Sequence, residues 1–223
     1  MYRAEQEIAG LEKCVESMKK GAQAHVRIRS DYAYGATGNE RYGIGPNSDL
    51  EYEVELVDFT KAKEPWAMTS SERLENSARV KDEGNRFFAE GRVSMAVRRY
   101  KRSLELVAHA NFNDEEKAQS KKLEVASNLN LAACYIKQGG KWKEVLGCCN
   151  KVLEYEHANI KALYRRSLAL TELREYEQAK RDLKQLLSID PTNAEAKRAN
   201  ASLDVKIKQQ DAKDRSLYSR MFA

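Results

Sequence analysis

Five polar residues in three separate stretches have the types and spacing of a site for an acidic peptide. Lys81 and Asn85 lie four residues apart, as do Lys161 and Arg165, so each pair would share one face of a helix. Asn130 lies between the two pairs. Cations and carboxamides that converge in one groove suit a ligand with two carboxylates and exposed amides. These residues therefore predict a peptide-binding site.

The helices that would carry these residues belong to a repeated pattern, which is clearest between residues 131 and 193. Similar residues recur 34 positions apart: Trp142 with Tyr176, Val145 with Ala179, Cys149 with Leu183, and Leu153 with Leu187. A 34-residue period with small and aromatic residues at fixed offsets resembles the tetratricopeptide repeat (TPR), a helix–turn–helix unit. In TPR arrays the first helix of each repeat lines a concave groove, and the five polar residues fall on first helices.

A more divergent repeat precedes these two. Ala96 aligns with Val145, but 49 positions separate them, and the extra residues lie mostly in 109–122. Gly84 would let two helices approach closely, and Phe87, Ala96 and Tyr100 would fill the space between them. The sequence therefore predicts three repeats.

The fold class that follows is mainly α, a TPR superhelix of seven helices. Three repeats supply six helices, and residues 193–222 supply a seventh that caps the open face of the last repeat. Thr69 with Glu72 predicts the start of the first long helix. We expect a TPR domain over 73–223, a linker over 61–72 and a separate segment over 1–60. The expected repeats span about 77–110, 124–157 and 160–193.

The first sixty residues predict a partial α+β segment with an antiparallel strand pair. Apolar residues recur with the spacing of one helical face: Ile8, Leu11, Val15 and Met18. Gly21 would end this helix. Residues 24–29 and 50–59 alternate between apolar and polar, as strands do, and a long loop over 31–49 would join them.

This segment resembles the C-terminal half of an FKBP-type peptidyl-prolyl isomerase domain. The resemblance rests on residues 31–38 (Asp-Tyr-Ala-Tyr-Gly-Ala-Thr-Gly), 45–47 (Gly-Pro-Asn) and 53–56 (Glu-Val-Glu-Leu). It implies that a remnant of the proline pocket is formed by five residues: Ile8, Leu11, Tyr34, Ile44 and Tyr52.

Two departures from the family argue against isomerase activity in this chain. Leu11 stands where active members carry a Trp that floors the pocket, and the pocket strands that precede this segment in the family are absent from the chain. Peptide isomerisation must lower a barrier of roughly 18–20 kcal/mol, which an open half-pocket cannot do because it does not exclude water. We expect an inactive, truncated form of a longer isomerase.

The five polar residues resemble the dicarboxylate clamp of TPR co-chaperones. That clamp holds the C-terminal Glu-Glu-Val-Asp of heat-shock protein 90 or of its seventy-kilodalton counterpart. The resemblance implies that Lys81, Asn85 and Asn130 hold the terminal carboxylate, aided by Lys161. It also implies that Lys161 and Arg165 reach the aspartate side chain or backbone carbonyls. Phe88, one turn after Asn85, would contact apolar residues of the ligand.

The function that these patterns favour is a chaperone-docking module of the large TPR-containing FKBP-type immunophilins. Two alternatives remain. One is an active FKBP-type prolyl isomerase that its TPR domain targets to chaperones. The other is a general TPR scaffold without a clamp.

Composition excludes several other classes. The net charge is +5 with 33% charged residues, but no dense basic face with stacking aromatics indicates nucleic-acid binding. No apolar run has membrane-spanning length, and the N-terminus is too charged for a signal peptide. We expect no cofactor and a cytoplasmic location, with the nucleus as a further compartment. The cysteines lack metal-site spacing and are predicted to be buried free thiols: Cys14, Cys134, Cys148 and Cys149.

The basic stretch over 206–220 allows two interpretations. With Ile207, Leu217 and Tyr218 it could form a calmodulin-type target helix. The same apolar stripe could instead pack on the preceding repeat. Residues 217–222 resemble the end of the helix that follows the TPR array in large immunophilins, which favours packing.

Overall fold

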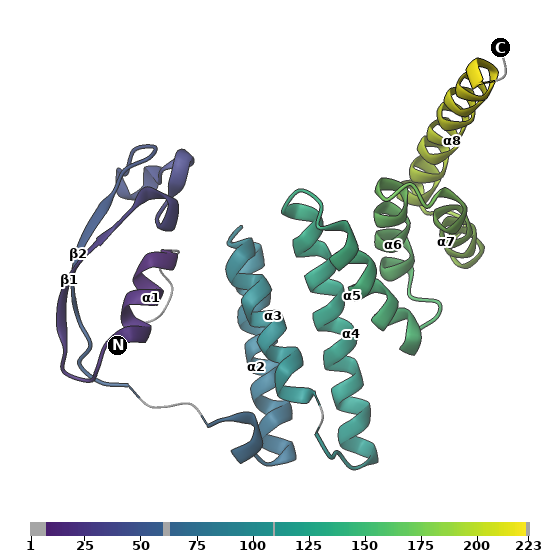
Figure 1. The fold of residues 1–223 in the computed structure, drawn as a ribbon. Helices are drawn as coiled ribbons and strands as arrows, with labels where there is room; N and C mark the ends of the chain where they lie inside the picture. Colours follow the sequence, from purple (N-terminus) through teal and green to yellow (C-terminus); the bar gives the residue numbers. More distant parts are fainter. Residues whose placement is uncertain (1–7, 60–62, 109, 222–223) are drawn as a thin grey trace. The chain divides into compact units, whose positions relative to one another are not determined.

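The computed structural model of the chain describes residues 8–59, 63–108 and 110–221, and it does not describe the side chains of Ala9, Arg41 and residues 216–221. The chain divides into two compact units, residues 1–64 and 65–223. Within these described residues, the first unit contains one α-helix and two strands, and the second contains seven α-helices (Figure 1).

The first unit is built from α1 (Ala9–Ser17), β1 (Gln23–Ile28) and β2 (Leu50–Glu55). The strands pair antiparallel, with Val26 opposite Tyr52, as the alternating patterns predicted, but the second strand ends at Glu55 and not at Phe59. Three short 3₁₀ turns shape the connection between the strands: Ser30–Tyr32, Gly35–Thr37 and Glu40–Tyr42.

The prediction that Gly21 ends the first helix was wrong. The helix ends at Ser17, and its C-cap is Met18 in an extended conformation. Gly21, with a φ of 77°, lies in the turn before β1, where its N–H donates to the Leu56 carbonyl at 2.7 Å. The glycine therefore serves the turn and not the helix.

A small apolar cluster holds the first unit together. Ile8, Leu11 and Ile28 are buried, and the apolar face of the strand pair packs on them with half-buried residues: Val26, Leu50, Tyr52 and Val54. Successive strand residues point to opposite faces, so charged residues such as Glu51 and Glu53 are exposed on the other face.

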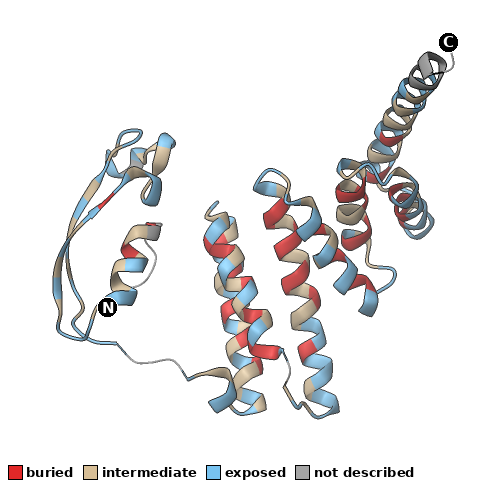
Figure 2. Cartoon of the chain, viewed as in Figure 1, coloured by how far each residue is buried: buried red, intermediate tan, exposed pale blue. Residues whose placement is uncertain are grey.

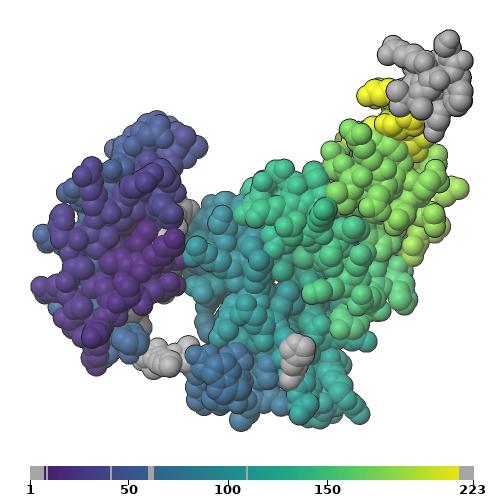
Figure 3. All heavy atoms as spheres, in the orientation of Figure 1, coloured from purple at the N-terminus to yellow at the C-terminus, as the bar shows by residue number. Residues whose placement is uncertain are grey.

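The second unit is a succession of antiparallel helices that follows a 3₁₀ turn at Pro65–Ala67. Its helices are α2 (Ser70–Ala89), α3 (Val93–Val107), α4 (Asp114–Lys137), α5 (Trp142–Tyr155), α6 (Ile160–Glu172), α7 (Tyr176–Ile189) and α8 (Ala194–Met221). Each helix packs on the next in the sequence. Figure 3 shows this order within the second unit as a gradual change of colour from blue through green to yellow. The predicted TPR array of seven helices is confirmed.

Two capping boxes fix where the first helices of the first two repeats begin. Thr69 accepts from the Glu72 N–H at 3.2 Å while Glu72 accepts from the Thr69 N–H at 2.9 Å, which confirms the predicted start of α2. Asn113 and Glu116 form the same pair at the start of α4. The extra segment of the first repeat is therefore largely an N-terminal extension of α4.

Buried residues line the surfaces where the helices meet (Figure 2). The cluster of the first two repeats includes Phe87, Ala96 and Tyr100, as predicted. Gly84 touches the Tyr100 ring, since a Cβ at this glycine would lie 2.7 Å from the nearest ring atom. The close approach that the glycine predicted is confirmed.

The last helix, α8, packs on the array through its first half. Ala196 and Leu203 are buried and Ile207 is half-buried against the core of the last repeats, so α8 is the predicted cap. The predicted packing of residues 217–222 falls outside the side chains that the structure describes. Among the helices it does describe, none has both the length and the apolar character that crossing a membrane requires.

The four cysteines are free thiols, but only two of them are buried. Cys134 and Cys149 face the core, whereas Cys14 and Cys148 are half-buried. Cys148 packs on the edge of the core cluster that contains Cys149, and burial raises its pKa to about 11. Burial raises the pKa of Cys134 to about 11 and that of Cys149 to about 12.

Candidate functional site: donors on the first helices of three repeats

The predicted peptide-binding residues lie on three helices, and the middle one packs against the other two. Helix α4 contacts both α2 and α6. We call the six predicted residues the clamp residues: Lys81, Asn85 and Phe88 on α2, Asn130 on α4, and Lys161 and Arg165 on α6. Periodicity placed them on separate first helices, and the packing of these helices decides which of them meet.

Asn85 and Asn130 are joined directly. The Asn130 Nδ2 donates to the Asn85 Oδ1 at 2.8 Å, and the hydroxyl of Tyr100 on α3 donates to the same oxygen at 2.8 Å. A carbonyl oxygen has two lone pairs, so these two donors occupy both. The NH₂ group of Asn85 is thereby left to donate elsewhere.

That NH₂ group and the Lys81 ammonium meet on one carboxylate oxygen. The Asp82 Oδ1 lies 3.2 Å from the Asn85 Nδ2 and 3.0 Å from the Lys81 Nζ. Asp82 is exposed, so this contact is open to solvent. The two groups thus already hold an anionic oxygen of the kind that a peptide carboxylate would present.

On α6, Arg165 reaches across to α4. Its guanidinium donates to the Leu129 carbonyl at 2.7 Å, next to Asn130. Burial lowers the pKa of Arg165 from its ordinary value, but an arginine stays charged in a protein. Lys161 is exposed one turn earlier on the same helix. Within the described part of the chain, it makes no hydrogen bond or ion pair with the other clamp residues.

Phe88 has a cationic neighbour that the sequence interpretation overlooked. The ring is half-buried against the first core cluster, and the Lys137 ammonium lies 5.2 Å from its centroid. Lys137 follows Asn130 by seven residues, a spacing that returns to the same helical face. This spacing was visible in the sequence and was a usable signal for a further cation.

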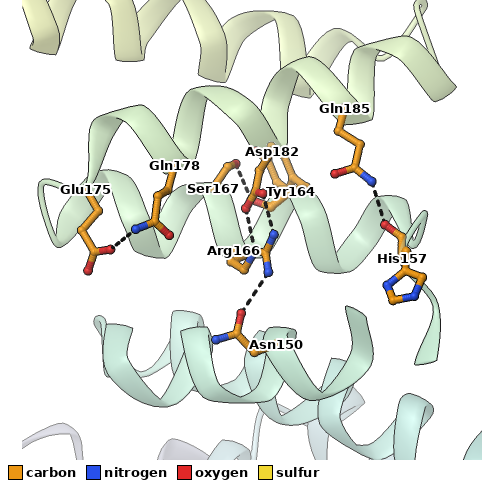
Figure 4. A network of polar contacts seen from close by, with 9 residues as sticks. All are labelled: Asn150, His157, Tyr164, Arg166, Ser167, Glu175, Gln178, Asp182 and Gln185. Carbon is orange, nitrogen blue, oxygen red and sulfur yellow. Dashed lines mark hydrogen bonds and ion pairs between the residues drawn. The ribbon is translucent and has the colours of Figure 1, made fainter. Parts of the chain in front are cut away.

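A second polar network joins the helices of the last two repeats (Figure 4). Arg166 forms a bidentate ion pair with buried Asp182 of α7, at 2.7 and 2.6 Å, and donates to Asn150 of α5 at 3.0 Å. Gln185 donates to the His157 carbonyl at 2.9 Å. The ion pair raises the pKa of Arg166. These contacts hold α5, α6 and α7 in register and so support the helix that carries Lys161 and Arg165.

In the first unit, four of the five remnant-pocket residues gather in one small cluster. Ile8 and Leu11 are buried in it, and Tyr34 and Tyr52 pack against its edge. Burial raises the pKa of Tyr52. Ile44 lies apart in the loop, in a backbone bridge with Asn39. Leu11 fills the centre of this cluster and is only 3% exposed.

The fold of the chain combines a helix and strand pair with a TPR array. Residues 2–57 match the family described as FKBP-type peptidyl-prolyl cis-trans isomerase, and residues 160–193 match the tetratricopeptide repeat. The chain belongs to the TPR-containing FKBP-type immunophilins.

Three similar proteins illustrate this assignment. Human peptidyl-prolyl cis-trans isomerase FKBP4 is 37% identical over 96% of this chain and 46% of its own length. A multi-domain immunophilin from Arabidopsis thaliana is 33% identical, covering 82% of this chain and 73% of its own, with a TM-score of 0.52. The C-terminal TPR-containing domain of an FK506-binding protein from Plasmodium falciparum is 28% identical, covering 67% and 99%, with a TM-score of 0.64.

The chain spans about half the length of the curated relatives that it matches, 46% for human FKBP4 and 48% for FK506-binding protein 59 of Drosophila melanogaster.

Proposed function

We propose that this chain is a chaperone-docking module. Its TPR domain, residues 73–223 with repeats at about 77–110, 124–157 and 160–193, binds the C-terminal Glu-Glu-Val-Asp tail of heat-shock protein 90. The tail of the seventy-kilodalton heat-shock protein, which ends in the same four residues, is the second candidate ligand. Membership of the TPR-containing immunophilins supports this proposal.

The observation that carries the proposal is that α4 contacts both α2 and α6 and forms hydrogen bonds to a clamp residue of each. Asn85 of α2 and Asn130 of α4 are hydrogen-bonded, and Arg165 of α6 bonds the carbonyl next to Asn130. Donors of α2 and α4 are therefore bonded to each other, and a donor of α6 is bonded to the backbone beside them. Such an arrangement suits an extended peptide end, which carries a terminal carboxylate, a side-chain carboxylate and backbone carbonyls.

In this proposal the donors divide between the two carboxylates of the peptide. Lys81, Asn85 and Asn130 bind the terminal carboxylate, aided by Lys161. Lys161 and Arg165 bind the aspartate side chain or backbone carbonyls, and Phe88 contacts apolar side chains of the peptide. Charge-assisted hydrogen bonds contribute about 1.5–3 kcal/mol each, and a micromolar complex needs only about 8 kcal/mol in total.

Calorimetry with a peptide that ends in Glu-Glu-Val-Asp tests the proposal on the full chain. Arg165→Ala and Lys161→Ala should each lose most of the affinity, and binding should weaken with salt because the contacts are ionic. Lys151→Ala, an exposed lysine of α5, is the matched control and should bind as the wild type does. A peptide with an amidated C-terminus should bind weakly because the terminal carboxylate is lost. Equal affinity of wild type and Arg165→Ala would contradict the clamp.

The alternative function is prolyl isomerisation, which the FKBP-type match of residues 2–57 suggests. Leu11, at the position expected for the pocket Trp, is packed inside a small apolar cluster. We expect this chain to leave the isomerisation rate of a proline peptide unchanged. Acceleration that an FKBP-pocket ligand inhibits would instead favour the enzyme.

A further inference from the structure

The orientation of the Asn85 carboxamide decides whether it attracts or repels an anion. Its NH₂ group donates and its Oδ1 accepts, so a 180° turn about the last side-chain bond would present the wrong end to a carboxylate. In the structure two donors hold the oxygen, the Tyr100 hydroxyl and the Asn130 NH₂ group, both at 2.8 Å. The Asn85 NH₂ group faces the Asp82 carboxylate at 3.2 Å, which shows the direction available to an incoming anion.

The two donors differ in how firmly they are held. Asn130 is half-buried on α4 and is itself one of the clamp residues, so a ligand can draw its amide away. Tyr100 is 1% exposed, and its ring lies against Gly84, the residue directly before Asn85. The contact with Gly84 brings the hydroxyl to the next side chain along α2. Tyr100 is therefore the fixed partner of the pair.

The Tyr100 hydroxyl also stays a donor under physiological conditions. Burial is the main cause that raises its pKa, to about 12. The phenol therefore remains protonated at neutral pH. A buried hydroxyl without a partner costs about 1–3 kcal/mol, so Tyr100 itself gains from keeping the Asn85 oxygen turned inward.

We propose that Tyr100 is a positioning residue of the clamp, which fixes the Asn85 carboxamide with its NH₂ group turned outward to meet a peptide carboxylate. Tyr100 does not contact the ligand in this arrangement. It determines which end of the Asn85 carboxamide faces the ligand. The inference rests on the proposed function for its ligand, but the geometry of Asn85 in the free protein can be tested without any peptide.

The first experiment is a double-mutant cycle on peptide affinity with Tyr100→Phe and Asn85→Ala in the full chain. Tyr100→Phe keeps the ring and its packing, and should weaken binding by about three- to tenfold, the loss of roughly one hydrogen bond. In the Asn85→Ala background the same change should have no further effect, because Tyr100 acts only through Asn85. Tyr135→Phe, another buried tyrosine of the same core cluster, is the control and should bind as the wild type. Equal losses in both backgrounds would mean a general structural role and would overturn the inference.

The second experiment is independent of the ligand. The side-chain NH₂ resonances of Asn85, assigned by their absence in Asn85→Ala, should shift or broaden in Tyr100→Phe and stay unchanged in Tyr135→Phe. If the wild type does not bind the peptide, the proposed function is wrong. The spectrum then still tests whether Tyr100 positions the Asn85 carboxamide. Unchanged Asn85 resonances in Tyr100→Phe would overturn that role whatever the peptide result.

Discussion

Arg165 and Arg166 are neighbours in α6, yet they bond to different helices. Arg165 donates to the Leu129 carbonyl of α4, whereas Arg166 is paired with Asp182 of α7 and bonded to Asn150 of α5. The two side chains point about 100° apart around the helix axis because a turn holds 3.6 residues. One arginine is therefore available to the proposed peptide site, and the other holds the last repeats together.

This division predicts that Arg166→Ala lowers stability and spares binding. Asp182 is almost completely buried, and removing its partner leaves a buried carboxylate unpaired. We expect the free energy of unfolding, measured by urea denaturation, to fall by about 2–4 kcal/mol. The affinity for a Glu-Glu-Val-Asp peptide, measured well below the unfolding transition, should change less than about twofold.

A matched control for Arg166→Ala is Lys180→Ala, which breaks the ion pair with Asp204 between α7 and α8. Both side chains of this pair are more than a third exposed. Solvent screens an exposed pair, which contributes little to stability, so the control should unfold almost as the wild type does. If Arg166→Ala were no more destabilising than the control, the inference that the buried Arg166–Asp182 pair holds the last repeats together would be wrong.

Much of the helical array could be predicted because its signals are local or periodic. The 34-residue spacing of Val145 and Ala179 indicates repeated packing. The Thr69–Glu72 pair indicates a helix start from a motif of only four residues. The start of α4 had the same kind of signal in Asn113 and Glu116, which was overlooked. Residues 109–122 were identified only as an insertion.

The contacts within the site could not be predicted in the same way. Tyr100 has the pattern of a core residue, and only the packing of α3 against α2 brings its hydroxyl to Asn85. The ion pair of Arg166 with Asp182 depends on how α6 meets α7. Periodicity shows which residues share a face of one helix, whereas these contacts depend on distances between helices. The roles of the clamp residues in binding stay predictions.

A second prediction concerns Asp82, whose carboxylate occupies donors that the proposed ligand needs. Its Oδ1 lies within 3.2 Å of both the Asn85 Nδ2 and the Lys81 Nζ. A peptide carboxylate must displace this oxygen and approach its negative charge. Asp82→Asn should therefore tighten peptide binding by about two- to fivefold in calorimetry at low salt, since exposed charges interact by less than about 1 kcal/mol.

The control for Asp82→Asn is Glu83→Gln, the same change of charge at the next residue. Glu83 pairs with Arg99 of α3 and not with the clamp residues. A general electrostatic effect would tighten binding equally in both variants, and would show that the Asp82 contact has no special role. Weaker binding in Asp82→Asn would mean that Asp82 helps to orient Lys81.

A third prediction is a loss of stability at alkaline pH from two buried thiols. Cys134 and Cys149 are fully buried, and their pKa values are raised to about 11 and about 12. An unfolded thiol has a pKa of about 8.5, so the folded state holds these protons more tightly. Their contribution is complete below pH 8.5 and is lost as pH rises toward the folded values. Each thiol should lower the free energy of unfolding by roughly 2 kcal/mol at pH 10.

Lysines and tyrosines also titrate in this range, so the readout is a difference between two proteins. The variant that combines Cys134→Ala with Cys149→Ala should be less stable at pH 7, because it creates cavities. Its stability, followed by urea unfolding under reducing conditions, should then decline less steeply between pH 8 and pH 10 than that of the wild type. Parallel declines would show that the thiols are not the cause.

The last prediction compares two helical glycines that differ in their surroundings. Alanine is the better helix former, by about 1 kcal/mol. At Gly147 of α5 no atom lies within 4 Å of an added Cβ, so Gly147→Ala should raise the free energy of unfolding by about 0.5–1 kcal/mol.

At Gly84 the same methyl group would lie 2.7 Å from the Tyr100 ring. Overpacking costs about 1–3 kcal/mol, so Gly84→Ala should be destabilising despite its better propensity. It should also weaken peptide binding, because a displaced Tyr100 no longer reaches Asn85. Thermal unfolding and calorimetry of the two variants measure both effects, and a stabilised Gly84→Ala with full affinity would contradict the close contact of α2 with α3.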